Sequence, residues 1–446
     1  MEEGLEAAAS PLLLAETSSS ESFKSASDPS LTPLLVFSSF VSLWGSFSYG
    51  CAVGYSSPAE SGIMEDLGLS VAAYSVFGSI LTIGGMVGAI LSGKMTDLIG
   101  RRGTMWICQV VCMAGWLAIA FAKNAWCVDI GRFVVGARRG DSYLCGASSQ
   151  LLVCCGSAVA FLAGSVVSWR ALSLIATIPN IVQFVGLFFV PESPRWLAKR
   201  GREKEFEATL QRLRGVKSDI SEEADDIRDA VETSKHTSDE AGNSRVVPEE
   251  ICLCNYSLGG NSAVAHYLGA IFAKVNFSTS IGPVVFSLLQ IPVSIVTIVL
   301  MDFFGRRTLL MASATTSCLS LLLVGLSFCL QEIQYLKELS TILAVVGLMG
   351  YGCGFALGMS GIPWVIMAEI FPVNIKASAG SLVVLNSWAS AWVMTYAFNF
   401  MLEWSPAGTF FIFCGMCAFT ILFIWKLVPE TKGRTLEEIQ STMTSS

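Results

Sequence analysis

The chain has 446 residues, of which 53% are apolar and only 14% are charged, and its mean hydropathy is +0.60. This composition excludes an ordinary soluble globular protein and indicates a chain that lies mostly in lipid. The net charge of -7 comes largely from solvent segments at the start of the chain and over residues 219–250, so it does not indicate a nucleic-acid partner. With two histidines, no nucleotide-binding loop and no metal-ligand cluster, the sequence carries no enzyme motif and no sign of a cofactor.

Residues 1–33 are rich in Ser, Ala and Glu and lack the ordered basic start and apolar core of a secretory signal, so they predict a disordered cytosolic tail. Ten apolar runs follow, each 19–28 residues long and therefore able to cross a bilayer as a helix. They lie near residues 34–54, 72–92, 104–122, 149–168, 171–190, 281–301, 308–330, 340–367, 378–402 and 407–427. The sequence thus predicts an all-α polytopic membrane protein.

A short charged phrase, DxxGRR, occurs at residues 97–102 and again at residues 302–307. Each copy separates two long apolar runs. Because charges are costly in the spanning region of a membrane protein, two equivalent charged turns indicate a duplicated chain with paired, movable halves.

The distribution of Lys and Arg, which mark the cytosolic ends of spans, requires an even number of crossings between successive basic clusters. Two intervals fail this requirement, and each contains a degraded apolar segment. Residues 125–135 would form only about 17 Å of helix against a hydrocarbon core of about 30 Å, and Arg138, Arg139 and Asp141 follow at once. Residues 251–273 are uncharged and long enough to cross, although several polar side chains weaken the segment.

Residues 191–250 are charged, with helical patterns at 203–214 and 221–233, and predict a cytosolic linker with short helices. The linker separates an N-terminal helix bundle, residues 34–190, from a C-terminal bundle, residues 251–428. A cytosolic tail, residues 429–446, ends the chain. Linker and tail begin with similar phrases, PESPR and PETKGR, which supports the duplication.

The fourteen cysteines lie mostly inside apolar runs, where small buried thiols are expected rather than a disulfide scaffold. Cys252 and Cys254 form a CxC pair, but His236 and His266 are the only histidines available to support a zinc site. No metal site is predicted.

Several phrases together resemble the sugar-porter branch of the major facilitator superfamily. They are the doubled DxxGRR, Gly131-Arg132 with Gly136, PESPRWL, GIPWVIMAEIFP at 361–372 and PETKGRTLEEI at 429–439. The sequences of residues 53–58, 61–67 and 78–80 are similar to those of plant monosaccharide transporters of the early-response-to-dehydration type. The resemblance implies two pseudo-symmetric six-helix bundles, here with ten clear spans and with spans 4 and 7 truncated.

In that family the two bundles rock around a central site, and charges at the cytosolic side hold the inner gate shut. Ion pairs at a water boundary are individually weak, about 0–1 kcal/mol, so a network of them can lock one state and still release it. The matching gate residues are Asp97, Arg101, Arg102, Arg132, Glu192, Arg195, Asp302, Arg306, Arg307, Glu369 and Glu430. The alternative role of these charged residues is to set the orientation of the spans in the membrane.

A sugar site needs amides and hydroxyls for the sugar hydroxyls and an aromatic face for the C–H surface. The resemblance carries the fifth-span Gln onto Gln150, the tenth-span Trp onto Trp364 and an eleventh-span aromatic onto Trp388. In the seventh span, Ser262 stands with Tyr256 and Ser257 where the family places a Gln pair and an Asn. For both tryptophans, helix packing or an interfacial position is the alternative.

The sequence argues against proton coupling, because family symporters place an Asp after the Gly-Tyr pair of span 1 and here Gly54-Tyr55 is followed by Ser56. Arg132 therefore lacks its matched carboxylate. The sequence favours facilitated diffusion of a hexose, with protons as a possible second cargo if Asp129 or another acid substitutes. A transport-impaired splice isoform or gene model, or a sugar sensor or partner subunit, is the alternative function.

Glu6 with the leucines at 12–14 loosely resembles an acidic dileucine sorting signal. Such tails in this family suggest the vacuolar membrane, with the plasma membrane as the alternative. We expect a multi-pass protein surrounded by membrane lipid, with both termini in the cytosol.

Overall fold

The computed structural model describes residues 32–138, 146–215, 218–236, 260–331, 333–370, 376–428 and 430. Every regular element in these ranges is helical, which confirms the all-α fold class. The sorting phrase at residues 6–14, the pair Cys252 and Cys254, the charges Arg139 and Asp141, and most of the C-terminal tail lie outside the described residues.

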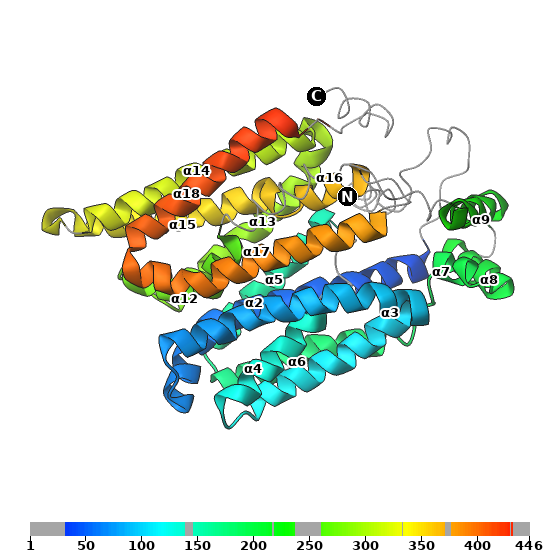
Figure 1. Ribbon diagram of the computed structural model, residues 1–446, viewed down its shortest axis with the longest axis horizontal. Helices are drawn as coiled ribbons and strands as arrows, with labels where there is room; N and C mark the ends of the chain where they lie inside the picture. The colour runs from blue at the N-terminus through cyan, green and yellow to red at the C-terminus, as the bar shows by residue number, and fades with distance from the viewer. Residues whose placement is uncertain are drawn as a thin grey trace.

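The described part of the first half forms five helices. They are α2 (Pro33–Leu67), α3 (Val71–Ala120), α4 (Ala125–Ala137), α5 (Gly146–Gly164) and α6 (Trp169–Gly186). The second half forms α11 (Asn261–His266), α12 (Leu268–Lys274), α13 (Ile281–Phe304), α14 (Arg306–Leu330), a 3-10 turn (Gln334–Leu336), α15 (Lys337–Gly354), a π-helical turn (Phe355–Met359), α16 (Ile362–Ile370), α17 (Lys376–Trp404) and α18 (Pro406–Leu427). Helices α2, α3, α4 and α6 lie together, as do α13, α14, α15 and α18, with α5 and α17 between the two groups (Figure 1).

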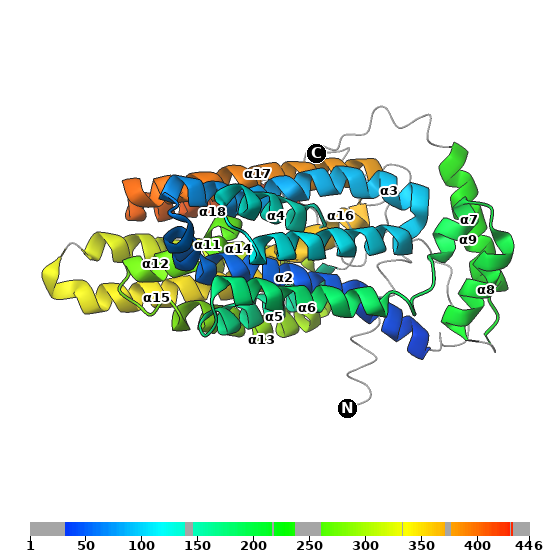
Figure 2. The ribbon, with the colours of Figure 1, turned by 90° about the horizontal axis from the view of Figure 1, so that it is seen from below.

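Three further helices, α7 (Pro194–Lys199), α8 (Glu203–Arg214) and α9 (Ser221–His236), lie at one end of the bundle in both views (Figures 1 and 2). They have a small core of their own, in which Leu197, Phe206 and Leu210 are buried. The two helical patterns read from the linker sequence therefore fold as helices. We call this end of the bundle the linker side and the opposite end the far side.

Six helical stretches among the described residues are long and apolar enough to cross a membrane by length and composition. One of them is α3, which counts once although it is divided at Gly100, where φ is 85° and ψ is 168°. The same break recurs at Gly305, between α13 and α14, with φ 80° and ψ 157°. A side chain disfavours this region of positive φ, so the glycine of each DxxGRR copy permits the turn that joins two spans.

Helix α4 is short, as the sequence predicts. It has 13 residues, or about 20 Å of helix at 1.5 Å per residue. It packs very closely on α3, because a Cβ on Gly84 would lie 2.1 Å from the carbonyl oxygen of Phe133, and one on Gly88 would lie 1.9 Å from that of Ala137. Glycine at these two positions brings the backbones into contact.

The seventh apolar segment differs from a single crossing helix. Over its described part it forms α11 and α12, which meet at Tyr267 with φ -114° and ψ 23°. Gly260 precedes α11 in the left-handed conformation. A broken helix inside a membrane protein is tolerated where it is buried in protein or lines a cavity, and both halves of this break are deeply buried.

Candidate functional site

A central cavity of about 100 Å³ lies between the two halves of the chain. From the first half it is lined by Tyr49, Val53, Gln150, Val153, Cys154, Ser157 and Phe161, and from the second by Asn261, Ser262, Ala265, His266, Phe286, Ser287, Gln290, Phe355, Trp364, Ser387, Trp388 and Ala391. Amides, hydroxyls and aromatic rings thus share one enclosure. This mixture suits a neutral polyhydroxylated ligand, which needs several hydrogen bonds and a flat apolar contact.

All four residues that the sequence analysis assigned to the sugar, Gln150, Ser262, Trp364 and Trp388, line this cavity. They come from four helices of the two halves, and only the fold brings them together. Their contact with a sugar stays a prediction. The polar residues Asn261, His266 and Gln290 were not assigned, although each is a polar side chain in an apolar stretch, which is the signal that could have found them.

The aromatic wall of the cavity is supported by packing. Trp388 is buried in a cluster with Ala89 and Val384, and Trp364 and Tyr49 pack against this cluster. The rings of Tyr49 and Trp388 meet edge to face, with centroids 6.4 Å apart. Aromatic pairs prefer such geometry and hold each other's orientation.

A chain of polar contacts crosses from one half to the other at the cavity. The Nε2 of Gln150 lies 3.5 Å from the Sγ of Cys154, which lies 3.4 Å from the Oε1 of Gln290 and 3.9 Å from the Oγ of Ser294. Thiols are weak donors and acceptors. These contacts are therefore easily exchanged for stronger ones to a ligand.

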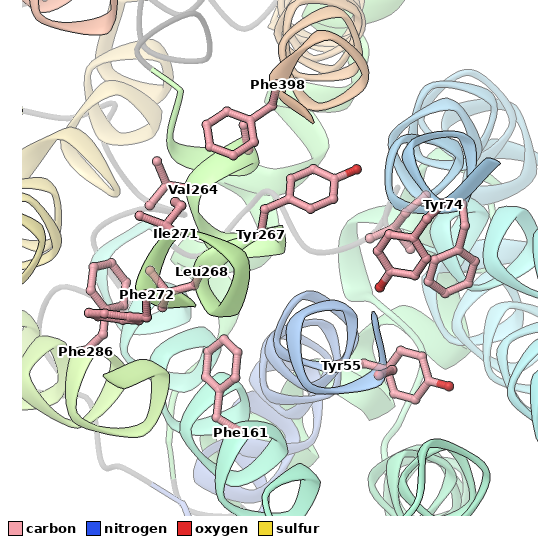
Figure 3. Close-up of a cluster of buried hydrophobic side chains, with 14 of the residues drawn as sticks. Tyr55, Tyr74, Phe161, Val264, Tyr267, Leu268, Ile271, Phe272, Phe286 and Phe398 are labelled. Atoms are coloured by element: carbon pink, nitrogen blue, oxygen red, sulfur yellow. The ribbon is translucent and has the colours of Figure 1, made fainter. Parts of the chain in front are cut away.

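The two halves meet closely on the far side. Tyr267 of the second half lies between Tyr74 of α3, at 6.3 Å between centroids, and Phe398 of α17, at 5.5 Å and 11° (Figure 3). The amide N of Gly269 donates to the Oγ of Ser57 at 2.8 Å. A further bond joins α17 to α3, from the Nδ2 of Asn399 to the Oγ of Ser75, at 3.0 Å. The far side of the cavity is therefore closed by rings and hydrogen bonds.

Arg132 lies beside this closure and is fully buried. Its Nη2 donates to the Oγ of Ser56, and its guanidinium carbon lies 5.6 Å from the ring centroid of Tyr55 and 5.1 Å from that of Phe77. Its Nε and Nη1 are buried and make no hydrogen bond within the described residues. Ser56 thus lies beside Arg132 at the position where family symporters are expected to carry an Asp.

On the linker side, each DxxGRR copy is held by a glutamate of its own half. Glu192 Oε1 accepts from the amide N of Arg102 at 3.1 Å. Glu430 accepts from the amide N of Arg306 at 2.9 Å and from that of Arg307 at 3.2 Å. In both halves a carboxylate therefore caps the start of the helix that follows the glycine break, where the helix dipole favours negative charge.

The other predicted gate residues are placed less symmetrically. Asp97 pairs with Lys199 of α7 at 2.7 Å, with both side chains more than half exposed, and its carbonyl oxygen accepts from Arg200 at 3.1 Å. Arg101 follows the Gly100 break in α3, and Arg195 belongs to α7. Asp302 and Glu369 belong to α13 and α16, but their side chains lie outside the described part. Lys199 and Arg200 were not among the predicted gate residues.

A second polar cluster, which the sequence did not predict, lies within the first half. Arg138 follows α4 and donates from Nη1 to the Oγ of Ser48 and to the Oδ1 of Asn180, both at 2.7 Å, and from Nη2 to the Oε1 of Gln183 at 2.5 Å. The side-chain amide of Gln109 lies 2.9 Å from the same oxygen of Gln183. The four partners are at most 3% exposed. This cluster ties the end of the short α4 to α2, α3 and α6.

No group of three or more His, Cys, Asp or Glu side chains gathers within the described ranges in a way that could hold a metal ion. The cavity chemistry is that of hydrogen bonding and stacking.

Comparison with known proteins gives a consistent result. The family model described as "Sugar (and other) transporter" matches residues 142–443, and that described as "Major Facilitator Superfamily" matches residues 42–140. The sugar transporter ESL1 of Arabidopsis thaliana is 45% identical over 439 residues, covering 93% of this chain and 93% of the relative. The sugar transporter ERD6 of the same plant is 42% identical over 447 residues, covering 93% of this chain and 89% of the relative.

Among solved structures, the proton:xylose symporter XylE bound to 6-bromo-6-deoxy-D-glucose superposes with a TM-score of 0.77 at 21% identity, over 92% of this chain and 99% of that chain. A partially occluded, inward-open form of XylE from E. coli also reaches 0.77 at 21% identity, over 91% of this chain and 100% of that chain. At this identity the likeness extends to the fold.

Proposed function

The chain belongs to the sugar transporter family of the major facilitator superfamily, and we propose that its cargo is a hexose that moves down its own gradient. As a member of this family it is a transport protein and not an enzyme. Gln150, Ser262, Trp364 and Trp388 are the proposed sugar contacts, which their shared position on one cavity supports. Alternating access would expose that cavity first to one side and then to the other.

The observation that carries the uncoupled mechanism is the pairing of Arg132 with Ser56. A symporter needs a group that gains and loses a proton as the cavity changes sides. A serine hydroxyl keeps its proton at physiological pH. The pair of Arg132 and Ser56 therefore cannot couple sugar movement to proton movement. Protons are therefore not a cargo in this proposal.

The gate role of the DxxGRR copies rests on their glutamate caps. Glu192 and Glu430 fasten each turn to its own half, so the two halves move as bodies and the closure of the linker side depends on charges at these turns. The far-side closure at Tyr267 is the opposing gate. Opening one side and closing the other then exchanges two sets of weak contacts.

We place the linker side and both termini in the cytosol, because basic residues concentrate there. The vacuolar membrane is the proposed location, from the acidic and leucine-containing tail at residues 1–33.

One observation favours a transport-impaired form as a second candidate. Helix α4, with 13 residues, covers only about 20 Å of a hydrocarbon core of about 30 Å. Uptake in yeast lacking hexose carriers, beside a version with the fourth and seventh spans restored, separates the two. Transport by the chain as it stands supports the first candidate, and rescue by the restored version alone supports the second.

The coupling proposal is tested in proteoliposomes with an imposed pH gradient, acid outside. We expect labelled glucose to reach the same internal and external concentration with or without the gradient, and a protonophore to change nothing. The variant Ser56→Asp, which places a carboxylate beside Arg132, should make the rate depend on pH. Accumulation of sugar above equilibrium by the unaltered chain would refute the uncoupled mechanism.

A further inference from the structure

Helix α11 forms one wall of the central cavity and carries the only histidine in a membrane helix of this chain. His266 lines the cavity together with Asn261 and Ser262, and its side chain is 1% exposed. An ionisable or strongly polar side chain within the spanning region is costly and is a functional candidate by default. The chain's other histidine, His236, ends α9 on the linker side.

The ring of His266 is oriented by its own helix. Its Nδ1 lies 2.6 Å from the carbonyl oxygen of Ser262, one turn earlier. A carbonyl oxygen can only accept, so Nδ1 carries the proton and Nε2 of the neutral ring is an acceptor. The hydrogen bond thus fixes both the tautomer and the direction of the ring.

The other polar groups on the cavity differ in this respect. Gln150, Gln290 and Asn261 carry amides, which can donate as well as accept, and Ser262 and Ser287 carry hydroxyls, which can do both. Each of these can satisfy a sugar hydroxyl in either sense. Nε2 of His266 can satisfy one only if that hydroxyl donates.

We propose that Nε2 of His266 accepts a hydrogen bond from one hydroxyl of the bound sugar and is a specificity-determining group of the site. The inference rests on the proposed function, because it assigns a contact within the same sugar cavity. It also explains how the cavity recognises a sugar although Ser262 and its neighbours replace larger amides in this span. A site built to hydrogen-bond a hydroxyl strongly rejects analogues that lack it.

The test uses the full-length protein in proteoliposomes, with D-glucose and two analogue series in which each hydroxyl in turn is replaced by hydrogen or by fluorine. Fluorine cannot donate. At one position we expect both analogues to compete about fivefold to tenfold less well than glucose, the loss of one net hydrogen bond. In His266→Phe that difference should disappear at that position only, and the KM for glucose should rise by a similar factor. His236→Phe, the matched control, should behave as the unaltered chain does.

Each outcome decides a separate point. If the unaltered chain moves no hexose, the proposed function fails. If it does, and His266→Phe discriminates among the analogues as before, the histidine contact alone is refuted. The proposal is also refuted if the fluorinated analogue of every position competes as well as glucose, because no sugar hydroxyl then donates to an acceptor-only group.

A second measurement avoids dependence on the folding of the phenylalanine variant. In the His236→Phe background, His266 is the single histidine, and its carbethoxylation by diethyl pyrocarbonate can be followed by mass spectrometry. Saturating D-glucose should slow the modification at least fivefold, whereas L-glucose should not. Equal rates with and without D-glucose would overturn the proposal.

Discussion

Replacing Asn180 by Leu should destabilise the first half of the protein, because this residue is the centre of the Arg138 cluster. Its Oδ1 accepts from the Nη1 of Arg138 at 2.7 Å and from the Oγ of Ser48 at 2.9 Å, and the side chain is 0% exposed. Leucine has a similar volume but no acceptor. The substitution therefore removes two interhelical hydrogen bonds, one of them to the half-buried guanidinium of Arg138.

The expected cost follows from hydrogen bonds measured between membrane helices, about 0.6 kcal/mol on average and about 1.7 kcal/mol at most. The bond to the charged group belongs at the upper end and the Ser48 bond near the average, so the total is about 2 kcal/mol. Leucine regains little, since lipid tails are as apolar as its own side chain. For a half of this size the melting temperature should fall by about 4–8 °C.

The assay is thermal unfolding of purified protein in mild detergent, with two comparison variants. Asn180→Asp keeps the acceptor and adds a charge opposite to that of Arg138, so its melting temperature should lie clearly above that of Asn180→Leu. Arg138→Met combined with Asn180→Leu removes both partners and should recover part of the loss. Equal stability of Asn180→Leu and the unaltered protein, or a lower stability of Asn180→Asp, would show that this cluster does not anchor the short α4.

Three further outcomes are expected. Gly78→Ala would place a methyl group 2.4 Å from the hydroxyl oxygen of Tyr267, so it should hinder far-side closure and lower the uptake rate several-fold. The double variant with Tyr267→Phe should recover uptake, and unchanged uptake by Gly78→Ala would contradict the role of Tyr267 in the far-side gate. Glu430→Ala leaves the first amides of α14 without their carboxylate and should destabilise by about 0.5–2 kcal/mol, with a smaller loss for Glu430→Gln, both read by thermal unfolding. Hydrogen bonds from the hydroxyl and amide of Ser221 lower the pKa of Asp219 below its usual 3.8. The stability that the Asp219 carboxylate adds to the start of α9 is therefore present at neutral pH and is lost as the pH falls through the folded pKa. A carboxyl NMR titration that gives a pKa of 3.8 or above would contradict this.

Much of the fold follows from hydropathy, because a run of about 20 apolar residues in a membrane protein forms a helix that crosses the bilayer. The apolar run at 407–427 corresponds to α18 (Pro406–Leu427), and the run at 378–402 to α17 (Lys376–Trp404). The glycine breaks at 100 and 305 also follow from the repeat. The far-side break at Tyr267 does not, and there the ring of Tyr267 packs between Tyr74 and Phe398, which are distant in sequence.

The candidate site was predictable residue by residue only where a motif marked it. Trp364 lies in a recognisable motif. Gln290 lies in an apolar run, and its hydrogen-bond partner Cys154 is distant in sequence. Arg138 illustrates the limit best. The sequence presents it as a charge that ends a defective span, and the structure surrounds it with oxygens from other helices. Pairings between helices depend on their relative rotation, which hydropathy does not specify.

The most direct measurement of the central claim is solute counterflow with the purified chain in proteoliposomes. Vesicles preloaded with unlabelled D-glucose are diluted into a trace of labelled D-glucose, without any ion gradient. An alternating-access carrier predicts a transient internal excess of label that then decays, and the same vesicles loaded with L-glucose should show none. Absence of the transient, with protein that is folded and correctly inserted, would contradict transport by this chain.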